Sequence, residues 1–302
     1  MSVAHGGAPA AAAGLAAPEP AQRRRGLVGY LLLAPAGLWL TLFFVVPLVT
    51  LVSTSLYDPT GSLELGYAMT GHVGNYTTVL QDYSQQFLRS LGYAGIATLV
   101  CILLGYPLAY AIAFKAGRWR NLMLVAVIAP FFTSFLIRTL SWQLILADQG
   151  WVVDAMRFLH LLGEDGRLLA TPLAVVTGLT YNFLPFMVLP LYASLEKIDA
   201  RLHEAGADLY ASPFTTFRKV TLPLSMPGLV AGTLLTFIPA AGDYINAELL
   251  GNTRTQMIGN VIQNLFDGGS YPEAASMSVT LMAVIVVMVL VYIWRSGTEE
   301  LV

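Results

Sequence analysis

The sequence predicts an all-α integral membrane protein with six transmembrane helices. Only 11% of its 302 residues are charged and 56% are hydrophobic, whereas about a quarter of a soluble domain is usually charged. The mean hydropathy is +0.66. Six segments reach the roughly 20 apolar residues that cross a bilayer. A single water-soluble core is therefore excluded.

The six expected spans follow one another along most of the chain. They are 27–52, 87–114, 121–147, 171–194, 224–247 and 273–294. An Ala/Gly/Pro-rich segment, 1–26, precedes them and is expected to be disordered and cytoplasmic. The first hydrophobic run has about 25 residues, which is too long for a cleavable signal core. The transmembrane domain is thus expected at 27–295, with a short cytoplasmic tail at 296–302.

Proline occurs in five of the six spans. Each proline removes a helical hydrogen bond that lipid cannot replace. Such breaks are tolerated where neighbouring helices or a polar cavity satisfy the freed carbonyls, and this pattern is more typical of transporters than of inert anchors. Ordinary kinking is the alternative for any single proline.

The basic residues predict the orientation of the spans. With the N-terminus inside, eleven lysines and arginines lie in cytoplasmic segments and only Arg157, Arg167 and Arg254 lie in external loops. The positive-inside rule then predicts that both termini lie on the cytoplasmic side of a cell membrane. The external loops are rich in acidic residues, which would weakly favour a cationic cargo.

Several chemistries have no support in the sequence. There is no G-x-x-x-x-G-K-[ST] phosphate loop and no arrangement of residues placed for catalysis. The four histidines share no metal-ligand spacing, so no metal site is expected. The net charge of −2 gives no indication of nucleic-acid binding. The chain is expected to move a solute rather than convert one.

The segment between the fourth and fifth spans, 199–228, predicts two short amphipathic helices outside the bilayer. Asp199 is a good N-cap for the first, and Ser212-Pro213 is typical of a second helix start. Leu222-Pro223 is expected to end the second helix. Apolar residues recur at helical spacing on one face of each helix, at Leu202, Ala205, Leu209 and Tyr210, then at Phe214, Phe217 and Val220. Exposed apolar surface of this kind indicates either a docking site or helices that lie on the membrane interface, anchored by Arg218 and Lys219.

The spacing within this segment resembles the EAA loop of ABC-importer permeases. Glu204-Ala205-Gly206 is followed by Val220 and Leu222-Pro223 at sixteen, eighteen and nineteen positions after Glu204. The resemblance implies a coupling loop over 199–223 that seats in a cleft of a cytoplasmic ATPase. Its residues would be Glu204, Ala205, Gly206, Leu209, Tyr210, Phe214, Phe217, Val220, Leu222 and Pro223. The resemblance also implies a role for single residues. Glu204 would cap a helix or form a salt bridge toward the ATPase, while Ala205, Gly206 and Leu209 would pack into the ATPase.

Two positions depart from the family's pattern. Gly206 replaces the usual alanine, which is a conservative change in size. Tyr210 replaces the usual glycine, so the tight turn of the family lacks its customary residue here. The following Ala211-Ser212-Pro213 can still interrupt the helix.

Three further segments, 130–150, 181–199 and 242–251, resemble permeases of spermidine/putrescine importers, in particular the subunit with the longer N-terminal portion. Permeases for opines, ferric iron, sulfate or thiamine share parts of these signatures. The resemblance implies a bacterial inner-membrane complex with a second permease, two copies of an ATPase that bind the ATP and Mg²⁺, and an external substrate-binding protein. A secondary transporter is the alternative from another class, although it would predict inverted repeats and paired membrane acids.

Four polar residues at membrane depth are candidates for a transport pathway or for structural support. An ionisable residue there costs roughly 2.5–3.5 kcal/mol and needs a partner or a wet cavity. Arg138 is expected to act structurally, by pairing with Asp243 or with a carbonyl at a helix end. Asp243, Tyr181 and Asn182 are the substrate-pathway candidates, because carboxylates and aromatic rings both attract amines.

Overall fold

The computed structural model describes residues 23–62, 64–163 and 166–296, so the expected N-terminal segment up to residue 22 and the tail from 297 lie outside the described residues. The described part is almost entirely helical. Its strand-like pairing consists of two isolated bridges, Tyr57 with Met69 and Ser62 with Gly66. Four helices are long and apolar enough to cross a membrane, or six if each of two bent helix pairs is one span.

The chain divides into two units at residue 50. In the first unit, α1 (Arg23–Leu40) continues through a π-helical turn (Thr41–Val45) into α2 (Val46–Thr54). Pro47 would clash with the carbonyl of Phe43 in a regular helix. The wider π turn contains Phe43 and accommodates this proline. The expected first span is therefore one long helix, apolar over Leu32–Thr54.

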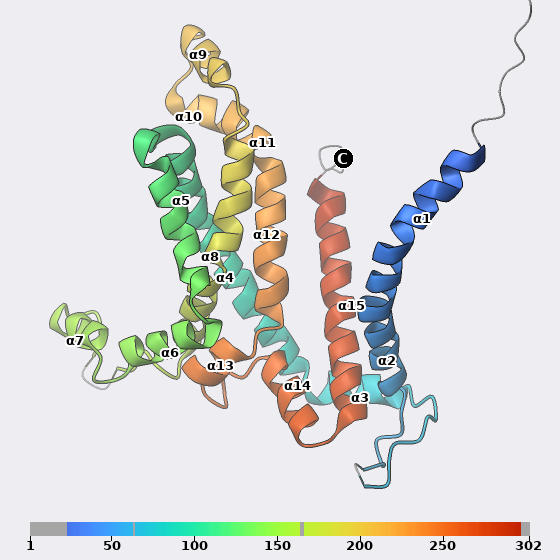
Figure 1. Ribbon diagram of the computed structural model, residues 1–302. Helices are drawn as coiled ribbons and strands as arrows, with labels where there is room; N and C mark the ends of the chain where they lie inside the picture. Colours follow the sequence, from blue (N-terminus) through green and yellow to red (C-terminus); the bar gives the residue numbers. More distant parts are fainter. Residues whose placement is uncertain (1–22, 63, 164–165, 297–302) are drawn as a thin grey trace, which may run out of the picture. The chain divides into compact units, whose positions relative to one another are not determined.

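The core of the second unit is built from three helices that pack side by side, α4 (Ser84–Tyr110), α8 (Pro172–Leu195) and α12 (Met226–Ala241) (Figure 1). A π-helical turn (Ala111–Lys115) extends α4, and α15 (Tyr271–Ser296) follows the expected sixth span. Small residues allow the close packing. A Cβ on Gly232 of α12 would lie 2.9 Å from Sδ of Met187 on α8.

The expected third span is a pair of helical segments with a sharp bend between them. A short 3-10 turn (Gly117–Trp119), α5 (Arg120–Ile128) and a second 3-10 turn (Ala129–Phe132) form its first half. The second half turns by 95° and contains α6 (Phe135–Leu146) and α7 (Trp151–Phe158). Thr133 is extended at the break (φ −102°, ψ 151°), and its hydroxyl donates to the carbonyl of Pro130 at 2.7 Å. The side chain thus satisfies a carbonyl that the broken helix leaves free.

The helix in the region of the expected fifth span, 224–247, is shorter than that span. α12 ends at Ala241, and α13 (Ile245–Leu250) is a separate helix beyond a short turn. α14 (Ile258–Asp267) and α3 (Gly74–Asp82) then pack with α15 around a small apolar cluster that includes Val79, Ile258 and Met277. Within this unit, α6, α13 and α14 lie at one end of the bundle and α9 (Ala200–Asp208) at the other (Figure 1).

Candidate coupling surface and buried polar cluster

The segment after α8 forms the two short helices that the sequence predicts, α9 and α10 (Pro213–Thr216). The Asp199 carboxylate accepts the backbone N–H of Arg201 at 2.9 Å. The Ser212 hydroxyl accepts the backbone N–H of Thr215 at 3.2 Å, with Pro213 at the first helical position. Both predicted N-caps are therefore confirmed.

A left-handed residue ends α9. Tyr210 has φ of 56°, a conformation that favours glycine. Its backbone N–H donates to the carbonyl of Ala207 at 2.9 Å, and that of Ala211 donates to Gly206 at 3.0 Å. This pair of bonds is a Schellman motif. The tight turn thus forms although tyrosine occupies the position of the usual glycine.

Three large apolar side chains of this segment are more than two-thirds exposed. Leu209 is 81% exposed, Tyr210 98% and Phe214 71%. We call these three residues the coupling face. Glu204 and Ala205 are exposed on the same short helix, α9. Side chains of this kind, on helices too short to be stable alone, indicate a surface that either a partner or the membrane interface covers.

Other predicted members of the coupling loop contact their own chain instead. The ring of Phe217 packs edge-on against Tyr106 at 5.6 Å and Tyr110 at 6.2 Å, both on α4. Gly206 faces α10, where a Cβ would lie 3.0 Å from Oγ1 of Thr216. Phe217 and Gly206 therefore hold the two helices in place.

The expected helix end at Leu222-Pro223 is wrong. α10 continues through a π-helical turn (Phe217–Thr221) into α11 (Leu222–Leu224), and the 64° bend comes afterwards, at Ser225. The π turn contains Lys219, whose carbonyl a regular helix would bring against the Pro223 ring. Val220 and Leu222 are half-buried, while Pro223 is exposed.

A charged cluster supports the end of α8 just before α9. Arg120, the first residue of α5, forms an ion pair with Glu196 and donates from Nε to the Tyr192 hydroxyl. Its guanidinium also lies 5.1 Å from the centre of the Tyr192 ring. Hydrogen bonding by Tyr192, and then by Arg120, lowers the pKa of the Glu196 carboxyl below its usual value.

A buried polar cluster joins α6, the turn after α12 and α13 to α8. Asp243, in the turn after α12, accepts through Oδ1 from the backbone N–H of Asn246 at 2.8 Å and from its Nδ2 at 3.1 Å. Asn182 of α8 donates from Nδ2 to Asn246 Oδ1 at 3.0 Å and to Thr139 Oγ1 at 3.2 Å. We call Thr139, Asn182, Asp243 and Asn246 the polar cluster.

The cluster brings together two predicted residues, Asp243 and Asn182, and adds two that the sequence analysis missed. Thr139 and Asn246 are neutral and lie in apolar segments, so no charge marks them. A signal was available for Asn246, because it follows Asp243 by three residues at a point where the fifth apolar segment ends. Glycine allows the close approach: a Cβ on Gly178 would lie 2.4 Å from Leu250 Cδ1 and 2.6 Å from Asn246 Oδ1.

Arg138 does not form the predicted pair with Asp243. Its guanidinium lies over the rings of Phe131 and Phe135, at 5.2 and 5.6 Å. Among the described residues, no hydrogen-bond acceptor reaches its Nε or Nη1, although the residue is buried. The aromatic rings partly compensate the charge through cation–π contact.

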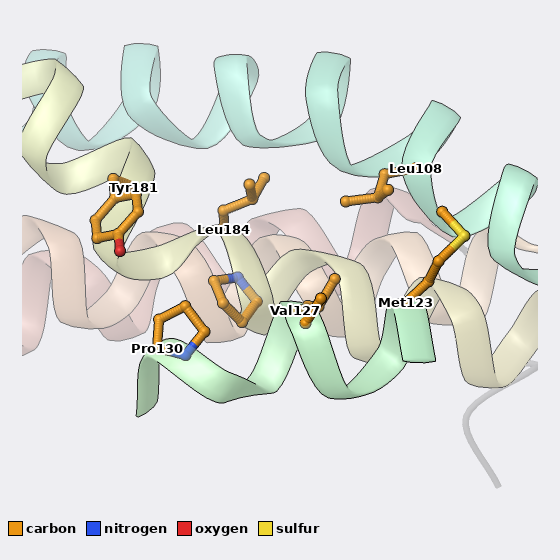
Figure 2. Close-up of a pocket in the computed structure, with 8 residues that line it drawn as sticks. Leu108, Met123, Val127, Pro130, Tyr181 and Leu184 are labelled. Atoms are coloured by element: carbon orange, nitrogen blue, oxygen red, sulfur yellow. The ribbon is translucent and has the colours of Figure 1, made fainter. Parts of the chain in front are cut away.

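Tyr181 lies outside the polar cluster, on the wall of an apolar pocket of about 320 Å³ between α4, α5 and α8 (Figure 2). Its ring packs against Trp142 at 5.4 Å. The other lining residues are Leu108, Met123, Ala126, Val127, Pro130, Leu184 and Pro185. Their apolar side chains offer no counter-charge to a cation, so this pocket is not suited to a charged solute.

The bundle of apolar helices and the short helix pair at one end are those expected of a membrane transport subunit. The family of binding-protein-dependent transport system inner membrane components matches residues 101–296. The chain belongs to this family, and it is the permease component of an ABC importer in the inner membrane.

Curated relatives and a crystal structure agree with this assignment. The chain is 39% identical over 86% of its length to the spermidine/putrescine transport system permease protein PotB of Escherichia coli, covering 94% of that protein. It is 37% identical over 84% of its length to PotB of Haemophilus influenzae, covering 89% of it. The fold matches a chain of a bacterial alginate ABC transporter, with a TM-score of 0.69 and 18% identity, over 91% of this chain and 96% of that one.

Proposed function

We propose that this permease imports polyamines, such as spermidine and putrescine, or a similar small cationic solute. The observation that carries this proposal is the similarity over most of the chain to permeases named for spermidine and putrescine. The polar cluster is consistent with such a cargo, because its one ionisable member is the carboxylic acid Asp243. The apolar pocket beside Tyr181 is a less suitable place for a cation, so Asp243 and Asn182 are the preferred pathway residues.

The complex would contain a second permease chain, two copies of a cytoplasmic ATPase with bound ATP and Mg²⁺, and an external binding protein. The coupling face would seat in the ATPase, with Glu204 and Ala205 beside it. The eleven basic residues of the expected cytoplasmic segments, against three in the external loops, support a cytoplasmic location for both the pair and the chain termini. Nucleotide-driven motion of α9 and α10 would then pass to α8 and α12, to which this segment is directly joined.

Transport by the complex purified from its native membrane tests the cargo. After reconstitution in liposomes with its binding protein, we expect ATP-dependent uptake of radiolabelled spermidine and putrescine. Sulfate and thiamine, offered at the same concentration, should not accumulate and should not stimulate ATP hydrolysis. Uptake of thiamine or sulfate without uptake of either polyamine would contradict the proposal.

A further inference from the structure

The hydrogen bonds of the polar cluster have one consistent direction. Asp243 Oδ1 already accepts the backbone N–H of Asn246, so the Asn246 side chain must present its NH₂ group to the same oxygen, as the 3.1 Å contact requires. The opposite orientation would place two acceptor oxygens in contact. Asn246 therefore turns its own oxygen toward Asn182.

This direction continues into the next amide. Because Asn246 presents an oxygen, Asn182 must present its NH₂ group, which donates to both Asn246 and Thr139. The oxygen of Asn182 consequently points away from the cluster. Asn182 is 1% exposed, and its Oδ1 has no hydrogen-bond partner among the described residues. An unpaired buried acceptor costs about 1–3 kcal/mol, so its retention needs a reason.

We infer that Asn182 Oδ1 accepts a hydrogen bond from an amine N–H of the cargo, and that Asp243 acts as a positioning residue through Asn246. This inference rests on the proposed polyamine cargo and assigns Asp243 a different role from that of a direct counter-charge. The carboxylate fixes the orientation of two amides in series. The result is an acceptor whose direction is set in advance for an ammonium or secondary amine.

The elements that cover Asn182 are suited to uncover it. Thr139 belongs to α6, after the break at residues 133–134, and Asn246 belongs to α13, after the turn at residues 242–244. Each therefore comes from a helix that the chain separates from the preceding half of its span. Movement of α6 away from α8 exposes the amide without unwinding α8, and it leaves the bond from Asn246 that fixes the direction of Asn182 in place.

Reconstituted complexes carrying variants of this chain test the inference through the amount of spermidine imported per ATP hydrolysed. Asn182→Leu should lower this ratio about tenfold or more, the loss expected for a hydrogen bond to a charged group. Asp243→Asn should cause a similar loss, because an amide at this position can accept or donate and no longer fixes the direction of Asn246. The double variant should be no worse than either single variant, since both act on one contact.

Rescue distinguishes positioning from simple structural support. In Asn182→Asp, both side-chain oxygens accept hydrogen bonds, so an acceptor faces the cargo whichever way the side chain is turned. This substitution should therefore restore spermidine import per ATP in the Asp243→Asn background. Thr236→Val is the matched control: it removes a buried hydroxyl on α12 that also has no hydrogen-bond partner among the described residues, and it should leave the ratio unchanged. Additive losses without rescue would overturn the inference. Equal import by wild type and Asn182→Leu would also overturn it, whereas absent polyamine uptake by the wild type would contradict the proposed cargo itself.

Discussion

The coupling face and the polar cluster depart in opposite ways from the usual relation between polarity and burial. The coupling face leaves Leu209, Tyr210 and Phe214 exposed. The polar cluster buries an acid and two amides. Each arrangement has a cost for an isolated chain, since exposed apolar patches associate and buried polar groups lose hydration. No described residue covers the exposed patch, whereas the buried cluster satisfies most of its atoms internally. Under the two proposals above, the first region would hold a permanent partner and the second a transient one.

Charged substitutions in the coupling face should have the largest effect. We expect the double variant Leu209→Glu, Phe214→Glu to weaken ATPase binding by about 100-fold, because interface anchors of this size contribute roughly 2–4 kcal/mol. Co-purification of the ATPase with the affinity-tagged permease measures this loss. Spermidine uptake should fall with it.

The matched control concerns the alternative in which the helix pair lies on the membrane. The double variant Arg218→Gln, Lys219→Gln removes the two basic residues that would anchor it to lipid headgroups, and both are exposed. It should retain the ATPase. If this control released the ATPase while the acidic variant kept it, the coupling face would not be the docking surface.

A smaller effect is expected where α13 packs on α8. Gly178→Ala adds a Cβ only 2.4 Å from Leu250 Cδ1 and 2.6 Å from Asn246 Oδ1, so these two side chains must move and the polar cluster must loosen. We expect a loss of about 1–3 kcal/mol in stability, the usual cost of overpacking, measured as a lower midpoint of thermal unfolding in detergent. Gly92→Ala in α4 is the control, because no atom lies within 4 Å of the added Cβ. A lower midpoint for the Gly92 variant alone would contradict this packing.

The sequence predicted the regular parts of the molecule well and its breaks poorly. Asp199 and Ser212 were recognisable as caps because capping depends on neighbouring backbone atoms. Pro185 lies within an uninterrupted α8, whereas Pro130 precedes a 95° break. The residue type is the same, so the difference comes from packing against other helices. For the same reason the sequence suggested a pair between Arg138 and Asp243 but not the contact between Asp243 and Asn246.

Replacement of Tyr210 tests how much its left-handed backbone conformation destabilises the end of α9. Tyr210→Gly should stabilise α9 by about 1 kcal/mol, because glycine adopts positive φ without a Cβ penalty. Slower amide hydrogen exchange across α9 would report this gain. Tyr210→Ile should have the opposite effect, since a β-branched residue is more strained there. Faster exchange in the glycine variant would show that the exposed tyrosine ring, rather than its backbone, determines the stability of this end of the helix.

The smallest effect is expected from the charged cluster of Arg120, Tyr192 and Glu196 at the end of α8. Because the pKa of Glu196 is lowered by Tyr192 and then by Arg120, its contribution to stability is present above the usual value of 4.5 and is lost as the pH falls through the lower folded pKa. Glu196→Gln should therefore flatten the decline of the unfolding midpoint below pH 4.5 while leaving its shape near neutrality unchanged. Tyr192→Phe keeps the ring beneath the Arg120 guanidinium but removes the hydroxyl, so it should flatten the same part of the profile to a lesser extent. Since the Glu196 side chain is 46% exposed, water screens the ion pair and the change should be slight. An unaltered acid profile in both variants would indicate that the stacking of Arg120 on Tyr192, and not the carboxylate, fixes α5 against the end of α8.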